Sequence, residues 1–145
     1  MRLDQRVGEK YKFHYPLKVR YAETDAQGHV FFGNYYTYFD EGLIEYLRQL
    51  GYTYQDLLDE GKDFLYVESQ CRHHSSARFD DVLNVHTTLA NIGNTSLTFE
   101  FSIFKQPADE LVATGYIVAV NVDRATRRPV SVPQALRDAA TDYEG

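Results

Sequence analysis

Tryptophan is absent from this 145-residue chain, and cysteine and methionine occur once each. The single cysteine, Cys71, has no partner for an internal disulfide and no second thiolate for a zinc site, so we expect a small buried apolar residue. No apolar run reaches the roughly 20 residues of a membrane-spanning helix, and the N-terminal residues lack a signal-peptide pattern. The expected protein is cytoplasmic and has no membrane partner.

Basic residues are also scarce. Lys and Arg number 15 against 21 Asp and Glu, which gives a formal net charge of −6. Proteins that bind nucleic acids draw much of their affinity from clustered positive charge, so this balance argues against a nucleic-acid partner. A polyanionic small ligand would need a local basic or amide-rich spot.

Aromatic residues, in contrast, are abundant, with 12 Tyr and 9 Phe. Their rings bury large apolar areas, so we expect them to fill the core or an interface. A chain of this length can bury one sizeable core and is too short for two. Residues 1–145 are therefore expected to form a single domain.

Apolar periodicity predicts one long helix and several strands. Residues 34–50 repeat apolar side chains at helical spacing, with Asn34 as the N-cap and Gly51 as the stop. Gly42 inside this helix suggests a close approach to a sheet. The other segments alternate with a period of two, except for two short helices. In chain order we expect a strand at 12–21, helices at 34–50 and 53–60, strands at 63–76, 82–92, 96–106 and 111–122, and a short helix near 134–141.

This order predicts an α+β fold. Hairpin-like joints at 92–96 and 106–110 connect three consecutive strands, which implies an antiparallel sheet. With the first strand included, the sheet has about five strands. The long helix must cover its apolar face.

The polar residues before the long helix are the main candidates for chemistry. Asp25 stands nine residues before Asn34, with Gly28 and Gly33 between them, so a strand–loop–helix unit can bring its carboxylate back to the first helical turn. Backbone N–H groups without partners at that end would stabilise an oxyanion, while the carboxylate attacks a carbonyl or activates water. The alternative is that Asp25 only caps a turn and Gly28 only serves a tight bend.

The run RYAETDAQGHVFFGNYYTYFDEGLIEYL, residues 20–47, resembles the signature of the 4-hydroxybenzoyl-CoA thioesterase family of hotdog proteins. In that signature Asp-x-x-Gly is followed by the Asn-Tyr pair that opens a central helix. Asp25, Gly28, Asn34 and Tyr35 stand in the matching places. A weaker likeness extends over residues 14–138. The family's fold is a sheet wrapped around one long helix, as the element order also predicts.

The resemblance implies hydrolysis of an acyl-CoA thioester without a cofactor. Asp25 would be the nucleophile or the general base, and the backbone amide of Phe32 or Gly33 would donate to the oxyanion. His29 would orient the thioester carbonyl or Asp25, or would only pack. Some relatives carry His or Tyr where Phe32 stands, so a side-chain role is in doubt there. Many carry Arg where Leu43 stands, so one ion pair of the family is missing.

Substrate contacts are expected at two further places. The resemblance places Asn34 and Tyr35 at the substrate, and the turn Asn94-Thr95-Ser96 offers hydroxyls and amides for the CoA phosphates, or forms only a turn. Four arginines are alternative phosphate ligands among which the sequence does not choose: Arg72, Arg78, Arg127 and Arg128.

Metal binding is not expected. His73 and His74 are adjacent, and neighbouring residues of a strand point to opposite faces, so they cannot easily share one ion.

Glu23 is a second acidic residue near Asp25. It either raises the pKa of Asp25 by like-charge repulsion, is solvated, or pairs with Arg20.

The resemblance also implies assembly into homodimers with active sites at the interface, and often into homotetramers. Two other functions stay open: hydrolysis of a thioester carried by acyl carrier protein, and a non-catalytic hotdog that binds acyl-CoA or serves as a scaffold. The acyl group is undetermined, because the ring-rich helix suits an aromatic acid, a fatty chain or simply the core.

Overall fold

The computed structural model describes residues 10–145 and contains one antiparallel sheet of five strands. The strands are β1 (Phe13–Lys18), β2 (Lys62–His73), β3 (Val82–Ile92), β4 (Ser96–Lys105) and β5 (Glu110–Asp123). Their order in the sheet is β1-β3-β4-β5-β2, so β1 and β2 form the two edges. The expected strand count and antiparallel pairing are confirmed, and Pro16 lies in an edge strand, where a residue without an N–H is tolerated.

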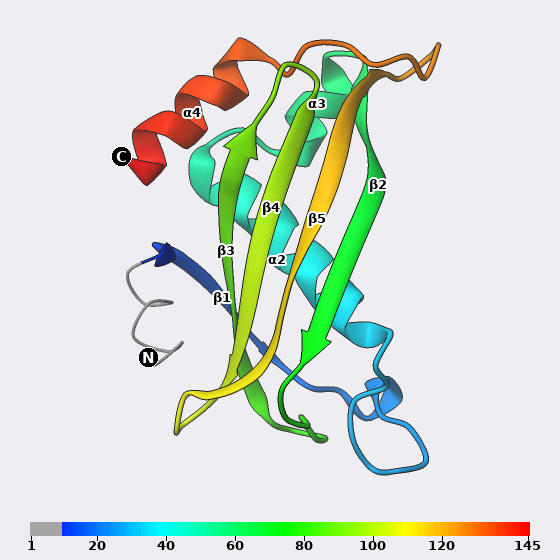
Figure 1. Ribbon diagram of the computed structural model, residues 1–145, viewed down its shortest axis with the longest axis vertical. Coiled ribbons are helices and arrows are strands. Elements are labelled where there is room, and N and C mark those ends of the chain that lie inside the picture. Colours follow the sequence, from blue (N-terminus) through cyan, green and yellow to red (C-terminus); the bar gives the residue numbers. More distant parts are fainter. Residues whose placement is uncertain (1–9) are drawn as a thin grey trace.

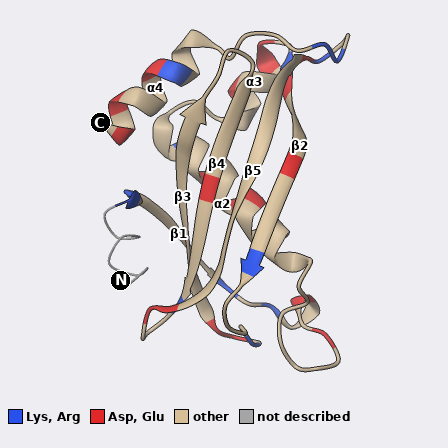
Figure 2. Ribbon diagram, in the orientation of Figure 1, with Lys and Arg blue, Asp and Glu red and all other residues tan. Residues whose placement is uncertain are grey.

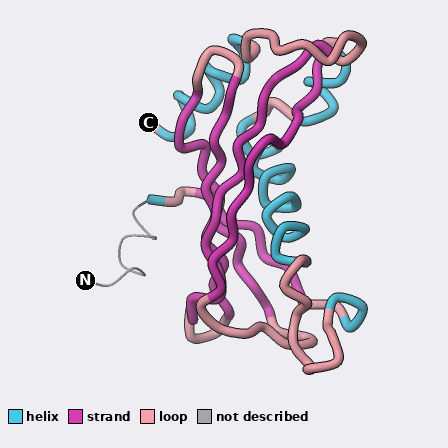
Figure 3. Tube along the Cα trace, turned by 45° about the vertical axis from the view of Figure 1, so that its right-hand side comes forward, coloured by secondary structure: helices cyan, strands magenta, loops and turns pink. Residues whose placement is uncertain are grey.

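The long helix α2 (Asn34–Leu50) lies along one face of the sheet (Figures 1 and 3). Its buried side is rich in rings, which pack against the inward residues of the central strands. Leu97, Phe99, Phe101 and Ile103 alternate along β4 on this face and are at most 1% exposed. The α+β arrangement of a sheet around a central helix is therefore confirmed.

Two glycines set how closely α2 meets the sheet. A Cβ on Gly42 would lie 2.7 Å from Val85 Cγ1 and 2.8 Å from Thr87 Oγ1, so only glycine fits without movement of β3. Gly115 of β5 leaves room for the ring of Phe39, which stacks on Phe101 with a centroid distance of 4.6 Å. The close approach expected at Gly42 is confirmed.

Three shorter elements complete the fold: the 3-10 turn η1 (Tyr21–Glu23), α3 (Tyr54–Asp59) and α4 (Gln134–Glu144). Thr53 caps α3, because its hydroxyl accepts from the amide of Asp56. The C-terminal helix α4 packs against α2 and β3, and Glu144 accepts hydrogen bonds from the hydroxyls of Tyr46 and Thr88. Within residues 10–145, no helix has the length and hydropathy to cross a membrane.

Three predicted boundaries were wrong. The first strand ends at Lys18 because Arg20 turns the chain into η1 through its backbone bond to the side chain of Glu23. The predicted strand 63–76 ends at His73, after which the chain runs into the loop that precedes β3. The final helix extends to Glu144, three residues beyond the expected end, because its last turn contacts α2.

Cys71 differs in part from its expected role. It is half-buried rather than buried, although it packs against the core, and burial raises the pKa of its thiol to about 11. A thiol held in its protonated form is a weak nucleophile. Cys71 is therefore no candidate for catalysis.

A cluster of rings from β1, β3, β4 and the residues just before β1 lies on the sheet face away from α2. His86 contacts Tyr11, His14 and Phe104 with ring-centroid distances of 5.8, 5.1 and 5.4 Å. Its Nδ1 is buried without a hydrogen-bond partner among the described residues. Burial, and then the neighbouring His14, lower the pKa of His86 to about 4, although Asp109 opposes this shift.

This cluster predicts that acid destabilises the fold. As the pH falls from 6.5 towards about 4, the unfolded chain takes up a proton that His86 in the folded protein does not accept. Because the ring is only half-buried, we expect a loss of about 1–2 kcal/mol over this window. Urea unfolding at about pH 7.5 and about pH 5 should show a smaller acid loss for His86→Gln than for wild type. Equal losses would contradict the assignment, and His74→Gln serves as the control outside the cluster.

Candidate active site

Asp25 lies in a tight loop between η1 and α2. Its amide donates to the carbonyl of His29 (2.9 Å), and its carbonyl accepts from the amide of Gly28 (3.0 Å). Gly28 has a φ of +84°, a conformation that favours glycine. One carboxylate oxygen, Oδ1, accepts from the amide of Gln27 (2.9 Å). Asp25 therefore caps a turn, which was the structural alternative to a catalytic role. It uses only one carboxylate oxygen to do so.

The other oxygen, Oδ2, faces His29. It lies 3.9 Å from His29 Nδ1, which is also 3.4 Å from the carbonyl oxygen of Val30. The side chains of Asp25 and His29 are 27% and 30% exposed, so water reaches both. The structure thus brings the two predicted residues together as a carboxylate–imidazole pair. The two groups are close but share no hydrogen bond, so the role expected for His29 stays a prediction.

The carbonyl of Glu23 ties this loop to the helix. It accepts from the amide of Phe31 (2.9 Å) and from Asn34 Nδ2 (2.9 Å). The predicted N-cap was therefore wrong: Asn34 is the first helical residue, Gly33 takes the cap position, and the Asn34 side chain bonds backward to the loop. Asn34 thereby holds the two ends of the loop at a fixed separation.

The carboxylate of Glu23 is engaged and buried. It accepts from Arg20 Nε (2.8 Å), the Arg20 amide (2.9 Å) and the Tyr38 hydroxyl (2.9 Å). Burial alone would raise the pKa of Glu23, but the bonds from Arg20 and Tyr38 hold it below its ordinary value. Of the three roles considered for Glu23, pairing with Arg20 is confirmed and solvation is excluded.

Two backbone amides remain free at the start of α2. The amides of Asn34, Tyr35 and Tyr36 donate to the carbonyls of Phe31, Phe32 and Gly33. In the described part of the chain, the amides of Phe32 and Gly33 have no acceptor. Free N–H groups at a helix N-terminus form a partial positive pole that suits an oxyanion. These are the two amides that the family resemblance singled out.

The side chains around these amides are aromatic. Phe32 is 65% exposed, whereas Tyr35 is 3% exposed, and its hydroxyl accepts weakly from the Ala77 amide (3.4 Å). Tyr35 therefore lies buried beneath the free amides of Phe32 and Gly33. Its role as a substrate ligand stays a prediction. The imidazole of His73, from the end of β2, packs against both rings.

Sequence reasoning missed His73 as a member of this region, because nothing in the local pattern shows that β2 ends beside α2. The expected opposite orientation of His73 and His74 is seen, since His74 Nε2 instead contacts Thr114 Oγ1 at 2.9 Å. Among residues 10–145, no three His, Cys, Asp or Glu side chains gather as metal ligands.

The turn Asn94-Thr95-Ser96 lies elsewhere. It joins β3 to β4 at the end of the sheet opposite to the Asp25 loop (Figure 1). Within one protomer the structure therefore does not bring these residues to the candidate site. Their proposed contact with the substrate would require a second copy of the chain.

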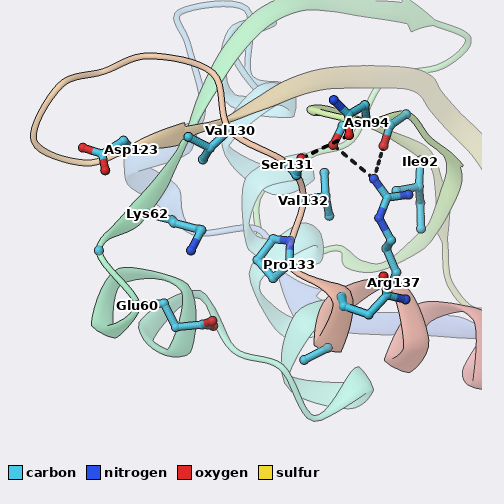
Figure 4. A pocket seen from close by; sticks show the side chains of 14 residues that line it. Glu60, Lys62, Ile92, Asn94, Asp123, Val130, Ser131, Val132, Pro133 and Arg137 are labelled. Atoms are coloured by element: carbon cyan, nitrogen blue, oxygen red, sulfur yellow. Dashed lines mark hydrogen bonds between the residues drawn. The ribbon is translucent and has the colours of Figure 1, made fainter.

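A cavity of about 1210 Å³ borders this turn (Figure 4). Arg137 donates to the carbonyls of Gly93 and Asn94, and Ser131 donates to Asn94 Oδ1 (3.1 Å). The nearby loop between β5 and α4 carries basic residues (Figure 2), and two of the four candidate arginines, Arg127 and Arg128, belong to it. The cavity lining itself carries Glu60 and Asp123 beside Lys62 and Arg137, so the excess of positive charge at this end comes from the loop.

The other two candidate arginines lie nearer to β2. Arg78 contacts the Asp25 loop, where its Nη1 lies 3.4 Å from the carbonyl oxygen of Gly28. Arg72 pairs in register with Thr114 and so lies on the sheet face away from α2. The candidate arginines are therefore divided between the two ends of the molecule.

Comparisons with known proteins show the family and the fold. Residues 19–140 match the Thioesterase-like superfamily. A putative esterase of Aquifex aeolicus is 31% identical over 87% of this chain and 98% of its own length. The acyl-CoA thioesterase YbgC of Haemophilus influenzae is 28% identical over 88% of this chain and 93% of its own length. A solved gentisyl-coenzyme A thioesterase superposes with a TM-score of 0.80 at 28% identity, over 88% of this chain and 98% of that one.

The predicted family is confirmed by these matches, which cover most of the chain. The matched residues 19–140 include the Asp25 loop, the long helix α2 and four of the five strands in full. The chain belongs to the Thioesterase-like superfamily, and the solved gentisyl-coenzyme A thioesterase shares its hotdog fold.

Proposed function

We propose that this protein hydrolyses acyl-CoA thioesters, with Asp25 as its catalytic carboxylate. One observation carries the proposal: the loop that presents Asp25 Oδ2 beside His29 ends in the free amides of Phe32 and Gly33. A carboxylate and oxyanion donors on one short, pinned segment are what hydrolysis of an activated acyl group requires. The names of the YbgC and gentisyl-coenzyme A relatives support the same activity.

In this mechanism the thioester carbonyl oxygen accepts from the two amides. Asp25 attacks the carbonyl carbon as a nucleophile or takes a proton from the attacking water. Negative charge then develops on the carbonyl oxygen, where a good donor contributes about 3–4 kcal/mol of transition-state stabilisation. In this proposal His29, whose Nδ1 lies 3.9 Å from Oδ2 of Asp25, orients that carboxylate. Phe32 contributes its amide, because its side chain has no polar group.

Thiol release from a panel of aromatic, short, medium and long acyl-CoAs tests this function. We expect release above the uncatalysed rate for at least one class. Release only from acyl carrier protein thioesters would favour the first alternative function. Binding of acyl-CoA with no release of thiol from either CoA or acyl carrier protein would overturn catalysis and favour the scaffold.

The cytoplasmic location expected from the sequence stays a prediction.

The proposed assembly is a dimer through β2. This strand forms a long edge of the sheet, and Tyr66 and Val67 on it are 48% and 60% exposed. Exposed strand edges recruit a further strand. Antiparallel pairing of two β2 strands would place the Asp25 loop of one protomer near the partner's opposite end. That end carries Asn94, Thr95, Ser96 and the large cavity, so in this dimer it would hold the CoA phosphates. Association of two such dimers would give the tetramer.

A charge placed on this edge should break the dimer. We expect wild type to sediment as a dimer or tetramer, and Val67→Lys to shift towards a monomer of 16.8 kDa with lower activity. Val82→Lys is the matched control, because Val82 is exposed at the start of β3, away from the β2 edge. A fully active wild-type monomer would contradict both the dimer and the shared site.

A further inference from the structure

His73, the last residue of β2, extends towards the start of α2. It pairs in register with Ala113, which is fully buried, so its side chain lies on the sheet face that α2 covers. Its ring meets Tyr35 and Phe32 edge-to-face, with centroid distances of 5.2 and 6.5 Å. Two aromatic neighbours thus hold the imidazole beside the segment that carries the free amides.

The polar atoms of this imidazole are uncommitted. In the portion that the structure describes, neither ring nitrogen of His73 has a hydrogen-bond partner, and the residue is exposed. The adjacent His74 differs, because it bonds to Thr114 on the other face of the sheet. A molecule bound at the amides of Phe32 and Gly33 would lie on the segment that His73 contacts, and the nitrogens of His73 are free to bond to it.

Hydrolysis of a thioester releases a thiolate that takes up a proton, and a positioned side chain can supply this proton faster than solvent does. Asp25 acts as a base or nucleophile, and His29 faces Asp25. Tyr35 is a poor donor, because burial raises the pKa of its hydroxyl, although the amide of Ala77, which donates to the Tyr35 oxygen, opposes this shift. The guanidinium of Arg78 does not give up its proton. His73 differs from His29 in that its ring nitrogens have no partner among the described residues, so its proton is available to a bound ligand.

We propose that His73 is the proton donor to the departing CoA thiolate, an inference that rests on the proposed hydrolysis. Water adds its oxygen to the carbonyl carbon and gives a proton to the carboxylate of Asp25. The C–S bond breaks, its electron pair goes to sulfur, and the imidazolium of His73 gives sulfur a proton. Asp25 then returns its proton through solvent to His73. The net reaction converts thioester and water into acid and thiol.

The basicity of the leaving thiol gives a specific test. A donor matters for a basic alkyl thiolate and matters little for a more acidic aryl thiolate. The substrates are two thioesters of the acid that wild type releases fastest from CoA, one with N-acetylcysteamine and one with thiophenol. The proteins are wild type, His73→Phe, His73→Gln and, as the matched control, His74→Phe. The phenylalanine at position 73 keeps the ring packing against Tyr35 and Phe32.

We expect His73→Phe and His73→Gln to lower kcat about 100-fold on the N-acetylcysteamine ester and less than about 5-fold on the thiophenol ester. His74→Phe should stay near wild type on both. Equal losses on the two esters, or no loss, would overturn the role of His73 while wild-type turnover keeps the proposed function intact. If His73→Phe does not fold, His73→Gln decides the question alone. An inactive wild type would instead refute the proposed function itself.

Discussion

Asp25→Asn should reduce kcat for acyl-CoA hydrolysis by about 10²–10⁴-fold. The asparagine side chain has nearly the same shape, and its carbonyl can still accept from the Gln27 amide, so the turn at Gly28 should persist. An amide cannot take a proton from water and is a poor nucleophile. The free amides of Phe32 and Gly33 remain, so some catalysis above the uncatalysed rate should survive.

Asp80→Asn is the matched control for this experiment. Asp80 is an exposed aspartate outside the Asp25 loop, and its φ of 72° is one that asparagine tolerates. Steady-state kinetics with a thiol-detecting reagent should give wild-type kcat for Asp80→Asn. A similar loss in both variants would indicate a general effect of removing surface charge and would contradict the specific role of Asp25.

Gly115→Ala should destabilise the fold by about 3 kcal/mol. A Cβ there would lie 2.1 Å from the backbone oxygen of Gln70 and 2.6 Å from Cε2 of Phe39. The first contact is with the backbone of β2, which no side-chain rotation relieves. The sheet would have to separate between β2 and β5, and the Phe39 ring would also have to move from its stack on Phe101.

The comparison for this prediction is Gly93→Ala. A Cβ on Gly93 would lie 2.7 Å from Ser96 Oγ, a side-chain atom that can rotate away. Urea unfolding should therefore show a loss below about 1 kcal/mol for this variant. If Gly115→Ala were as stable as Gly93→Ala, the register of β2 on β5, which also positions His73, would be wrong.

The helix and most strands could be predicted because their signals are local. The apolar spacing over 34–50 and the left-handed Gly51, with a φ of 85°, set the helix end correctly. The two faces of β4 follow from strict alternation. Gly42 within a helix also pointed to its packing partner, since close contact with a sheet is one of the few reasons for glycine at such a position.

The contacts that shape the site depend on tertiary structure. Asn34 is a residue type that often caps helices. Its side chain instead donates a hydrogen bond to the backbone carbonyl of Glu23, eleven residues earlier in the chain. Glu23 pairs with Arg20, rather than repelling Asp25 or staying solvated, for two tertiary reasons. The chain turns at Arg20, and the Tyr38 hydroxyl reaches Glu23 from the helix. The place of His73 depended on the order of strands in the sheet, which brings β2 to an edge beside the start of α2. Spacing along the chain does not encode these contacts.

The central claim is that Asp25 and the amides at the start of α2 hydrolyse an acyl-CoA thioester. It is tested most directly by measuring thiol release and binding on the same samples of wild type and Asp25→Asn. Thiol release uses the best acyl-CoA of the panel, and binding uses its thioether analogue, which cannot be hydrolysed. The account predicts that Asp25→Asn binds the analogue as wild type does and loses most of its turnover. Undiminished turnover by Asp25→Asn would contradict it.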